Sequence, residues 1–144
     1  MKIFQGMATS VSALTAEKLR LDVIAHNLAN INTTRGNNGE PFRRKMVLFR
    51  EVADQALSRE KANRQIGRGV RIAAIVEDQA TPLRPEYNPS HPDADGAGIV
   101  RYPNVELSTE LIDLMNAQRS YQINLGVFNT SRQMADKALE LGRG

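Results

Sequence analysis

Cysteine and tryptophan are absent from this sequence of 144 residues, and aromatic residues make up only 5% of it. The lack of cysteine excludes disulfides, thiolate metal sites and a cysteine nucleophile. No apolar run approaches the roughly 18 residues that a membrane-spanning helix requires, so we expect no membrane span. The opening stretch MKIFQGMATSVSALTAEK holds no continuous apolar core followed by a cleavage site. We therefore expect no ordinary secretory signal peptide, and any export needs another route.

Proline is also missing from the first part of the chain, and all six prolines lie at positions 41, 82, 85, 89, 92 and 103. Because proline breaks helices, the two proline-poor ends are free to form long ones. This distribution predicts an α+β protein in three parts. The parts are an N-terminal coiled-coil helix over 1–32, a small domain rich in strands and loops over 33–104, and a C-terminal coiled-coil helix over 105–144.

Apolar residues recur at alternating steps of four and three residues in both end segments, which is the heptad pattern of a coiled coil. Lys18 interrupts the first repeat, and Gln118 and Arg132 interrupt the second. Periodicity leaves open whether the two helices close on each other within one chain or bury surface between chains. We predict an assembly seam formed by Met7, Val11, Leu14, Leu21, Leu28, Leu107, Leu111, Leu114, Tyr121, Leu125, Phe128 and Leu139.

Three residues of the second helix, Ile112, Met115 and Ile123, are apolar but lie off its main seam. A hairpin of two helices would leave such residues uncovered. They indicate that a third neighbour packs against this helix.

Between the helices, the segments KMVLFREV, GRGVRIAAIVED and GIVRYPNV have the short apolar runs typical of strands. The segments QATPLRPEYNPSHPDADGAG and SREKANRQIGRG are predicted to be loops.

An asparagine-rich stretch, LANINTTRGNNGEPFRRK, separates the first helix from the first strand. We expect Asn30 and Asn32 to adopt the left-handed backbone that ends many helices. Thr33 and the dipeptide ending in Gly39 add turn chemistry, and Pro41 prevents helical continuation. The stretch is therefore predicted to end the helix and reverse the chain.

Catalytic and metal-binding patterns are weak throughout. The glycines of the asparagine-rich stretch follow a helix and precede a strand, the reverse of a phosphate-binding loop. The run SHPDADGAG places His91 and Tyr102 where a calcium loop requires acidic ligands. His26 and His91 are the only histidines and cannot supply three ligands alone. We expect no catalytic residue, no cofactor and no metal, so an enzyme ranks last among the function classes.

Positive charge is concentrated between residues 35 and 71, a segment that contains ten basic residues and four acidic ones. This asymmetry raises the possibility of a basic adaptor that binds a polyanion. No helix-turn-helix, zinc-finger or RNA-recognition pattern accompanies it, and a solvated basic face is the simpler interpretation. We expect no nucleic-acid partner.

The helix ending in Asn27, Leu28, Ala29, Asn30 and Thr33 resembles the hallmark of bacterial flagellar axial proteins, the rod and hook components. The link to the basic residues is longer here than in much of that family and is similar to that of a proximal-rod component. The second half agrees, although Ile123 stands where relatives often carry alanine. Its matching marks are Pro89 to Pro92, Gly98, Pro103 to Val105, Glu110, Met115, Arg119, Tyr121, Asn124 and Met134.

This resemblance implies that the terminal helices pair as a coiled coil, pack with neighbouring subunits into a tube wall, and are largely disordered before assembly. It implies a structural subunit of the proximal rod, the drive shaft that carries torque from motor to hook. The chain would reach the rod, outside the cytoplasmic membrane, through type III export. The implied partners are copies of itself, neighbouring proximal and distal rod subunits, the basal-body base and the export apparatus. A sibling rod or hook component is the nearest alternative.

Overall fold

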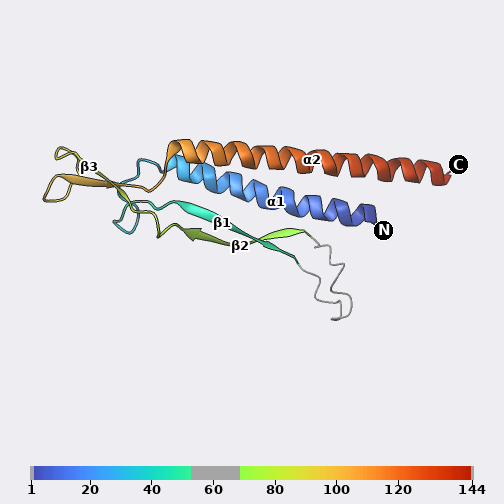
Figure 1. Ribbon diagram of the computed structural model, residues 1–144, viewed down its shortest axis with the longest axis horizontal. Helices are drawn as coiled ribbons and strands as arrows, with labels where there is room; N and C mark the ends of the chain where they lie inside the picture. Colours follow the sequence, from blue (N-terminus) through green and yellow to red (C-terminus); the bar gives the residue numbers. More distant parts are fainter. Residues whose placement is uncertain (1, 53–68, 144) are drawn as a thin grey trace. The chain divides into compact units, whose positions relative to one another are not determined.

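The computed structural model describes residues 2–52 and 69–143, with a long helix at each end and short strands between them (Figure 1). This architecture confirms the predicted α+β class. The elements in chain order are α1 (Lys2–Ala29), β1 (Lys45–Glu51), β2 (Val70–Glu77), β3 (Arg84–Tyr87), β4 (Ile99–Tyr102) and α2 (Leu107–Arg143).

The chain divides into two compact units. Unit 1 comprises Met1–Leu19, Leu48–Ala74 and Ala117–Gly144, and unit 2 comprises Arg20–Val47 and Ile75–Asn116. Each unit therefore takes a portion of both helices and of the β1–β2 hairpin. The division into domains over 1–32, 33–104 and 105–144 follows the order of the elements and stays a prediction.

Strands β1 and β2 form a two-stranded sheet, as their apolar runs predicted. In unit 2 the backbone N–H of Asp78 donates to the carbonyl of Arg44 at 2.8 Å. In unit 1 the N–H of Val52 donates to the carbonyl of Gly69 at 2.9 Å. The partners run in opposite directions along the chain, so the pairing is antiparallel. The predicted loop SREKANRQIGRG lies outside the described residues except for its last residue.

The second sheet belongs to unit 2 and pairs β3 with β4 in antiparallel register, from Arg84 opposite Tyr102 to Tyr87 opposite Ile99. The GIVRYPNV segment was predicted as a strand and supplies β4. The loop predicted over QATPLRPEYNPSHPDADGAG is wrong at β3, where Pro85 had argued against a strand. In a sheet of two strands, both strands are edges, so the missing N–H of Pro85 costs no ladder bond to a further neighbour.

In unit 1 the start of β2 lies close to α1. The N–H of Val70 donates to the Ser12 hydroxyl at 3.1 Å, and that hydroxyl donates to the carbonyl of Thr9 at 2.7 Å. Gly69 has a φ of +124°, and a Cβ built on it would lie 2.2 Å from the Ser12 oxygen. Any other residue here would have to displace the Ser12 side chain and hold a φ that side chains rarely adopt.

Replacing Gly69 with alanine is expected to lower the free energy of unfolding by about 2 kcal/mol, because the new methyl group must displace Ser12 and strain the backbone. Urea unfolding followed by circular dichroism measures the change. The matched control is Gly96→Ala, since a Cβ at Gly96 meets nothing within 4 Å. Equal losses for the two variants would contradict the proposed close contact.

Candidate functional site

None of the predicted seam residues is fully buried in the single chain. Leu107 is 54% exposed, Leu125 39% and Leu139 68%, and Val11 and Leu111 are also exposed. The other members are half-buried: Met7, Leu14, Leu21, Leu28, Leu114, Tyr121 and Phe128. One chain thus leaves much of this apolar surface accessible.

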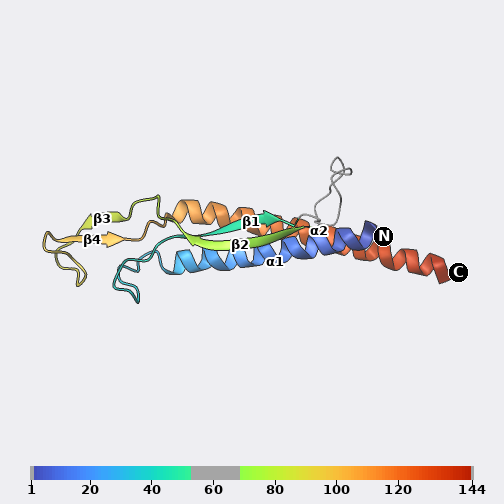
Figure 2. The same cartoon turned by 90° about the horizontal axis from the view of Figure 1, so that it is seen from below.

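The buried positions of the two helices are mostly small or polar instead. In unit 1 they include Ser10 and Ala16 on α1, and Ala117 and Ser131 on α2. The two helices run side by side there, as both views show (Figures 1 and 2). Small side chains allow two helices to approach closely, so the intrachain contact uses a face adjacent to the predicted seam.

In unit 2 the buried face of α1 carries Asn27, which is 1% exposed and joins three elements. Its side-chain amide donates to the carbonyl of Lys45 at 2.9 Å, and its carbonyl oxygen accepts from the N–H of Lys45 at 2.9 Å. The same amide also donates to Glu110 of α2 at 3.2 Å. Asn27, predicted as part of the turn motif, therefore holds the first residue of β1 against both helices.

Arg44, Glu110 and Asp113 extend this network, and with Asn27 we call them the polar clamp. The guanidinium of Arg44 donates to the buried carboxylate of Glu110 through Nε, and to Asp113 through Nη2 at 2.8 Å. Asp113 also lies 3.6 Å from Arg20 of α1. Burial disfavours the charge on Arg44, but the hydrogen bond and charge of Glu110, aided by Asp113, raise the pKa of Arg44 above its usual value.

A second polar junction orients the chain on either side of the clamp. The buried side chain of Asn104 accepts from the N–H of Arg44 at 2.8 Å and donates to the carbonyls of Asp78 and Thr81 at 3.0 and 3.1 Å. Hydrogen bonds from the side chain and backbone of Thr81 hold the pKa of Asp78 below its usual range. The end of β2 and the approach to α2 are thereby fixed to the start of β1.

The end of α1 differs from the prediction at Asn30 and Asn32. Among the described residues, no residue other than glycine has a positive φ, so the left-handed backbone predicted for both asparagines is wrong. Asn30 instead donates from its side chain to the carbonyl of His26 at 2.9 Å and accepts from the Thr33 hydroxyl at 3.2 Å. A side chain that bonds its own helix end removes the need for a left-handed residue.

Replacing Asn30 with alanine is expected to cost about 1 kcal/mol of stability, because the turn loses two side-chain hydrogen bonds while keeping its backbone geometry. Thermal unfolding of Asn30→Ala beside Asn32→Ala measures the difference, since Asn32 is exposed in the same turn. An Asn30→Ala variant as stable as Asn32→Ala would show that these bonds contribute nothing.

The tight turn predicted at Gly39 is confirmed, with a φ of +75° and an N–H that donates to the carbonyl of Gly36 at 3.0 Å. The backbone of Phe42 returns to Thr33, with N–H donating to carbonyl at 3.1 Å. Pro41 lies half-buried in the returning arm of this loop. The asparagine-rich stretch thus ends the helix and reverses the chain, as predicted.

The segment that resembled a calcium loop serves as a turn between β3 and β4. Asp95 accepts from the N–H groups of Ala97 and Ile99 at 2.9 and 3.0 Å, and these bonds lower its pKa, that from Ile99 most. Asp93 accepts from the Thr34 hydroxyl at 2.7 Å. Across the described ranges 2–52 and 69–143, no cluster of three acidic or histidine side chains could hold a metal ion.

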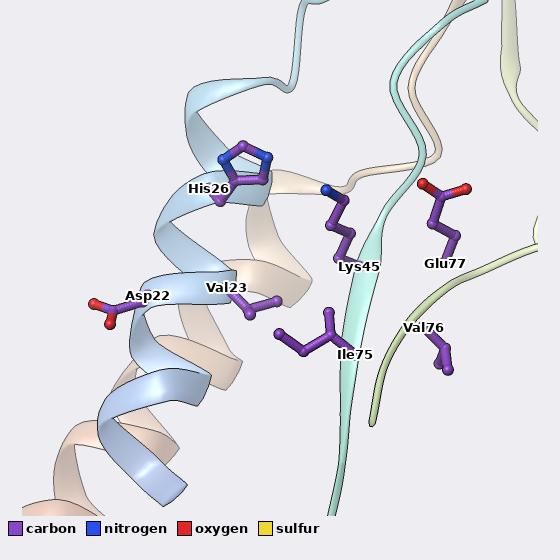
Figure 3. Close-up of a pocket in the computed structure, with 7 residues that line it drawn as sticks. All are labelled: Asp22, Val23, His26, Lys45, Ile75, Val76 and Glu77. Atoms are coloured by element: carbon purple, nitrogen blue, oxygen red, sulfur yellow. The ribbon is translucent and has the colours of Figure 1, made fainter. Parts of the chain in front are cut away.

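Unit 2 also contains an open cleft of about 470 Å³ beside α1 (Figure 3). Val23 of α1 and Ile75 of β2 face each other across it, and the charged groups of Lys45 and Glu77 lie toward one end. Asp22, His26 and Val76 complete the lining. His26 packs edge-on against Phe42, with ring centroids 5.4 Å apart. The volume is in the range of sites that accept apolar groups, about 300–1,000 Å³.

Sequence reasoning did not assign roles to Arg44, Asn104, Glu110 or Asp113 in the clamp and its junction. Glu110 and Asn104 stood within the segments that carried the family resemblance, which was the available signal. Hydropathy patterns do not identify these polar residues, because the helix surface carries other carboxylates at similar spacing.

Neither of the described helices combines the length and the apolar character that a membrane span requires.

Comparison with known proteins finds two family matches, one at each end of the chain. Residues 7–35 match the family described as flagella basal body rod protein, and residues 97–141 match the C-terminal family of the flagellar basal body rod FlgEFG proteins. Together these matches cover most of both helices.

Several similar proteins carry the name flagellar basal-body rod protein FlgC. The protein from Borreliella burgdorferi is 36% identical, with all of both chains covered. That from Bacillus subtilis is 38% identical over 99% of this chain and 100% of its own. That from Salmonella typhimurium is 42% identical over 92% of each.

Proposed function

Because this chain belongs to the FlgC family of flagellar basal-body rod proteins, we propose that its two long helices supply the contacts that hold it in the rod. The chain is a structural subunit of the basal-body rod, and that rod is where it resides. Its similarity to FlgC proteins over nearly the whole length favours this family above a sibling rod or hook component.

The exposure of the predicted seam is the observation that carries the proposal. Leu107, Leu111 and Leu125 are between 39% and 54% exposed, although their seven-residue pattern is that of a buried coiled-coil surface. Within one chain, the buried positions of both helices are mostly small or polar, with Val23 and Ile24 of α1 as the large apolar ones. The apolar seam is therefore available to neighbouring subunits, and a non-closing contact of this kind builds tubes and filaments.

The polar clamp has a supporting role in this proposal. Within unit 2 it fixes the start of β1 to the adjoining ends of α1 and α2, so β1 begins in one defined place on both helices. Buried polar groups can specify a single arrangement where apolar contacts would tolerate several. A single arrangement suits a rod subunit, because an error in the arrangement of one subunit would be repeated in every copy along the rod.

We further propose that the chain has no catalytic role and serves proximal-rod assembly and torque transmission from motor to hook. Its partners would be further copies, neighbouring proximal and distal rod subunits, the basal-body base, and the export apparatus during delivery. The names of its relatives support the rod component in general, and the identity of each neighbour is part of the proposal.

A deletion experiment tests the function. Cells that lack this chain are expected to build no hook or filament and to be non-motile, and the intact chain supplied in trans restores both. An epitope-tagged copy should co-purify with isolated basal bodies. Normal hooks and filaments in the deletion strain would overturn the rod assignment.

A further inference from the structure

The C-terminal end of α2 lacks cover in unit 1. Ser131 is the last buried residue of the helix, and all side chains from Asp136 to Leu141 are exposed. In both views α2 continues past the first turn of α1 (Figures 1 and 2). We call residues 134–142 the overhang.

The overhang presents a large apolar face to water. Met134 is 51% exposed and Leu141 is 84% exposed. These two residues and the exposed Ala138 are spaced by four and three positions, so they lie on one side of the helix. A short uncovered stretch of helix is marginal by itself, and exposed apolar residues at such a site mark a contact with another molecule.

The cleft beside α1 in unit 2 has complementary properties. Its floor is apolar, with Val23 and the 45% exposed Ile75, and the charged groups of Lys45 and Glu77 lie at one end of its rim. The overhang flanks its apolar face with Lys137 and Glu140, which pair with each other at 2.7 Å. Seating the apolar face in the cleft would bring this lysine near the Glu77 carboxylate and this glutamate near Lys45.

We propose that the overhang of one copy seats Met134, Ala138 and Leu141 in the α1 cleft of a second copy. This inference rests on the proposed rod function and names one contact within it. Donor and acceptor surfaces both occur on this one chain, so the same contact can repeat from copy to copy. It is heterologous and leaves one free overhang and one free cleft at the ends of each row, as an extending structure requires.

The absence of native cysteine permits a direct test by disulfide cross-linking. Leu141→Cys and Ile75→Cys are made in separate copies, both are co-expressed, and basal bodies are isolated and mildly oxidised. We expect a disulfide-linked band at twice the chain mass, because the two sulfurs come within bonding distance only across the proposed contact. Tags of different size on the two copies identify the band as a mixed dimer.

The control pair is Asp136→Cys with Ile75→Cys, since Asp136 is exposed on the opposite side of the overhang. It should give less than about a tenth of the mixed dimer. Both copies present in basal bodies without a mixed dimer would overturn the inference and leave the rod function intact. A link of Leu141→Cys to another basal-body protein, or to itself, would overturn the choice of occupant. Absence of both copies from basal bodies would overturn the function as well.

Discussion

Replacing Glu110 with glutamine is expected to lower the free energy of unfolding by about 3 kcal/mol, because Arg44 then lies half-buried without its main counter-charge. The glutamine side chain has nearly the same size and can still accept the hydrogen bond from Asn27. The loss in unfolding free energy therefore measures the contribution of the negative charge. Glu110 is fully buried, and its carboxylate accepts from both Arg44 and Asn27. Equilibrium unfolding in urea measures the change.

The matched control is Glu140→Gln, which removes a carboxylate from the exposed ion pair with Lys137. Such surface pairs contribute at most about 1 kcal/mol. Adding Arg44→Met to Glu110→Gln should recover part of the loss, since no buried positive charge then remains. If Glu110→Gln is no more destabilising than Glu140→Gln, the clamp is not a source of stability.

Replacing Leu125 with aspartate is expected to abolish incorporation into the rod while leaving the isolated chain folded. Leu125 is 39% exposed, so in one chain the carboxylate can stay hydrated, and the cost in stability should be below about 1 kcal/mol. In the assembled seam the same charge would be desolvated without a partner, at a cost of several kcal/mol. Immunoblots of isolated basal bodies and swimming assays measure the two consequences.

Gln122→Asp is the control for this variant, because Gln122 is exposed on the same helix but off the seam. It adds the same charge and should support motility. Normal motility of the Leu125→Asp strain would count against the seam as the assembly surface. Circular dichroism of the purified variant separates a failure of assembly from a failure to fold.

The parts of the fold with a strong repeating pattern could be predicted from sequence. Both helices and strands β1, β2 and β4 follow from the seven-residue repeats and short apolar runs, which arise directly from element geometry. Strand β3 was missed because Pro85 is unusual in strands, and only the two-stranded topology makes it acceptable. The turn at Asn30 was placed correctly with the wrong backbone, since its side-chain bonds to His26 and Thr33 were not foreseeable.

The faces of the helices were harder to assign. An apolar seam has a hydropathy signal, whereas small residues such as Ala117 and Ser131 have almost none. The helix face used within the chain could therefore not be predicted from hydropathy. The apolar repeat that could be recognised in the sequence belongs to the surface that we propose for assembly. The pairing of Asn27 with Lys45 joins residues 18 apart through a loop, and no local rule determines which backbone groups such a side chain meets.

The bond pattern of Asn27 bears on how the unassembled chain avoids aggregation. Its carboxamide offers one donor and one acceptor to Lys45, which is what an adjoining strand would offer. A sheet of two strands has two open edges, and open edges invite pairing with strands of other molecules. At the first residue of β1 that position is already taken by a side chain of the same chain. Asn27 thereby blocks the pairing of a strand from another molecule at this point of the β1 edge, and association is left to the other surfaces of the chain.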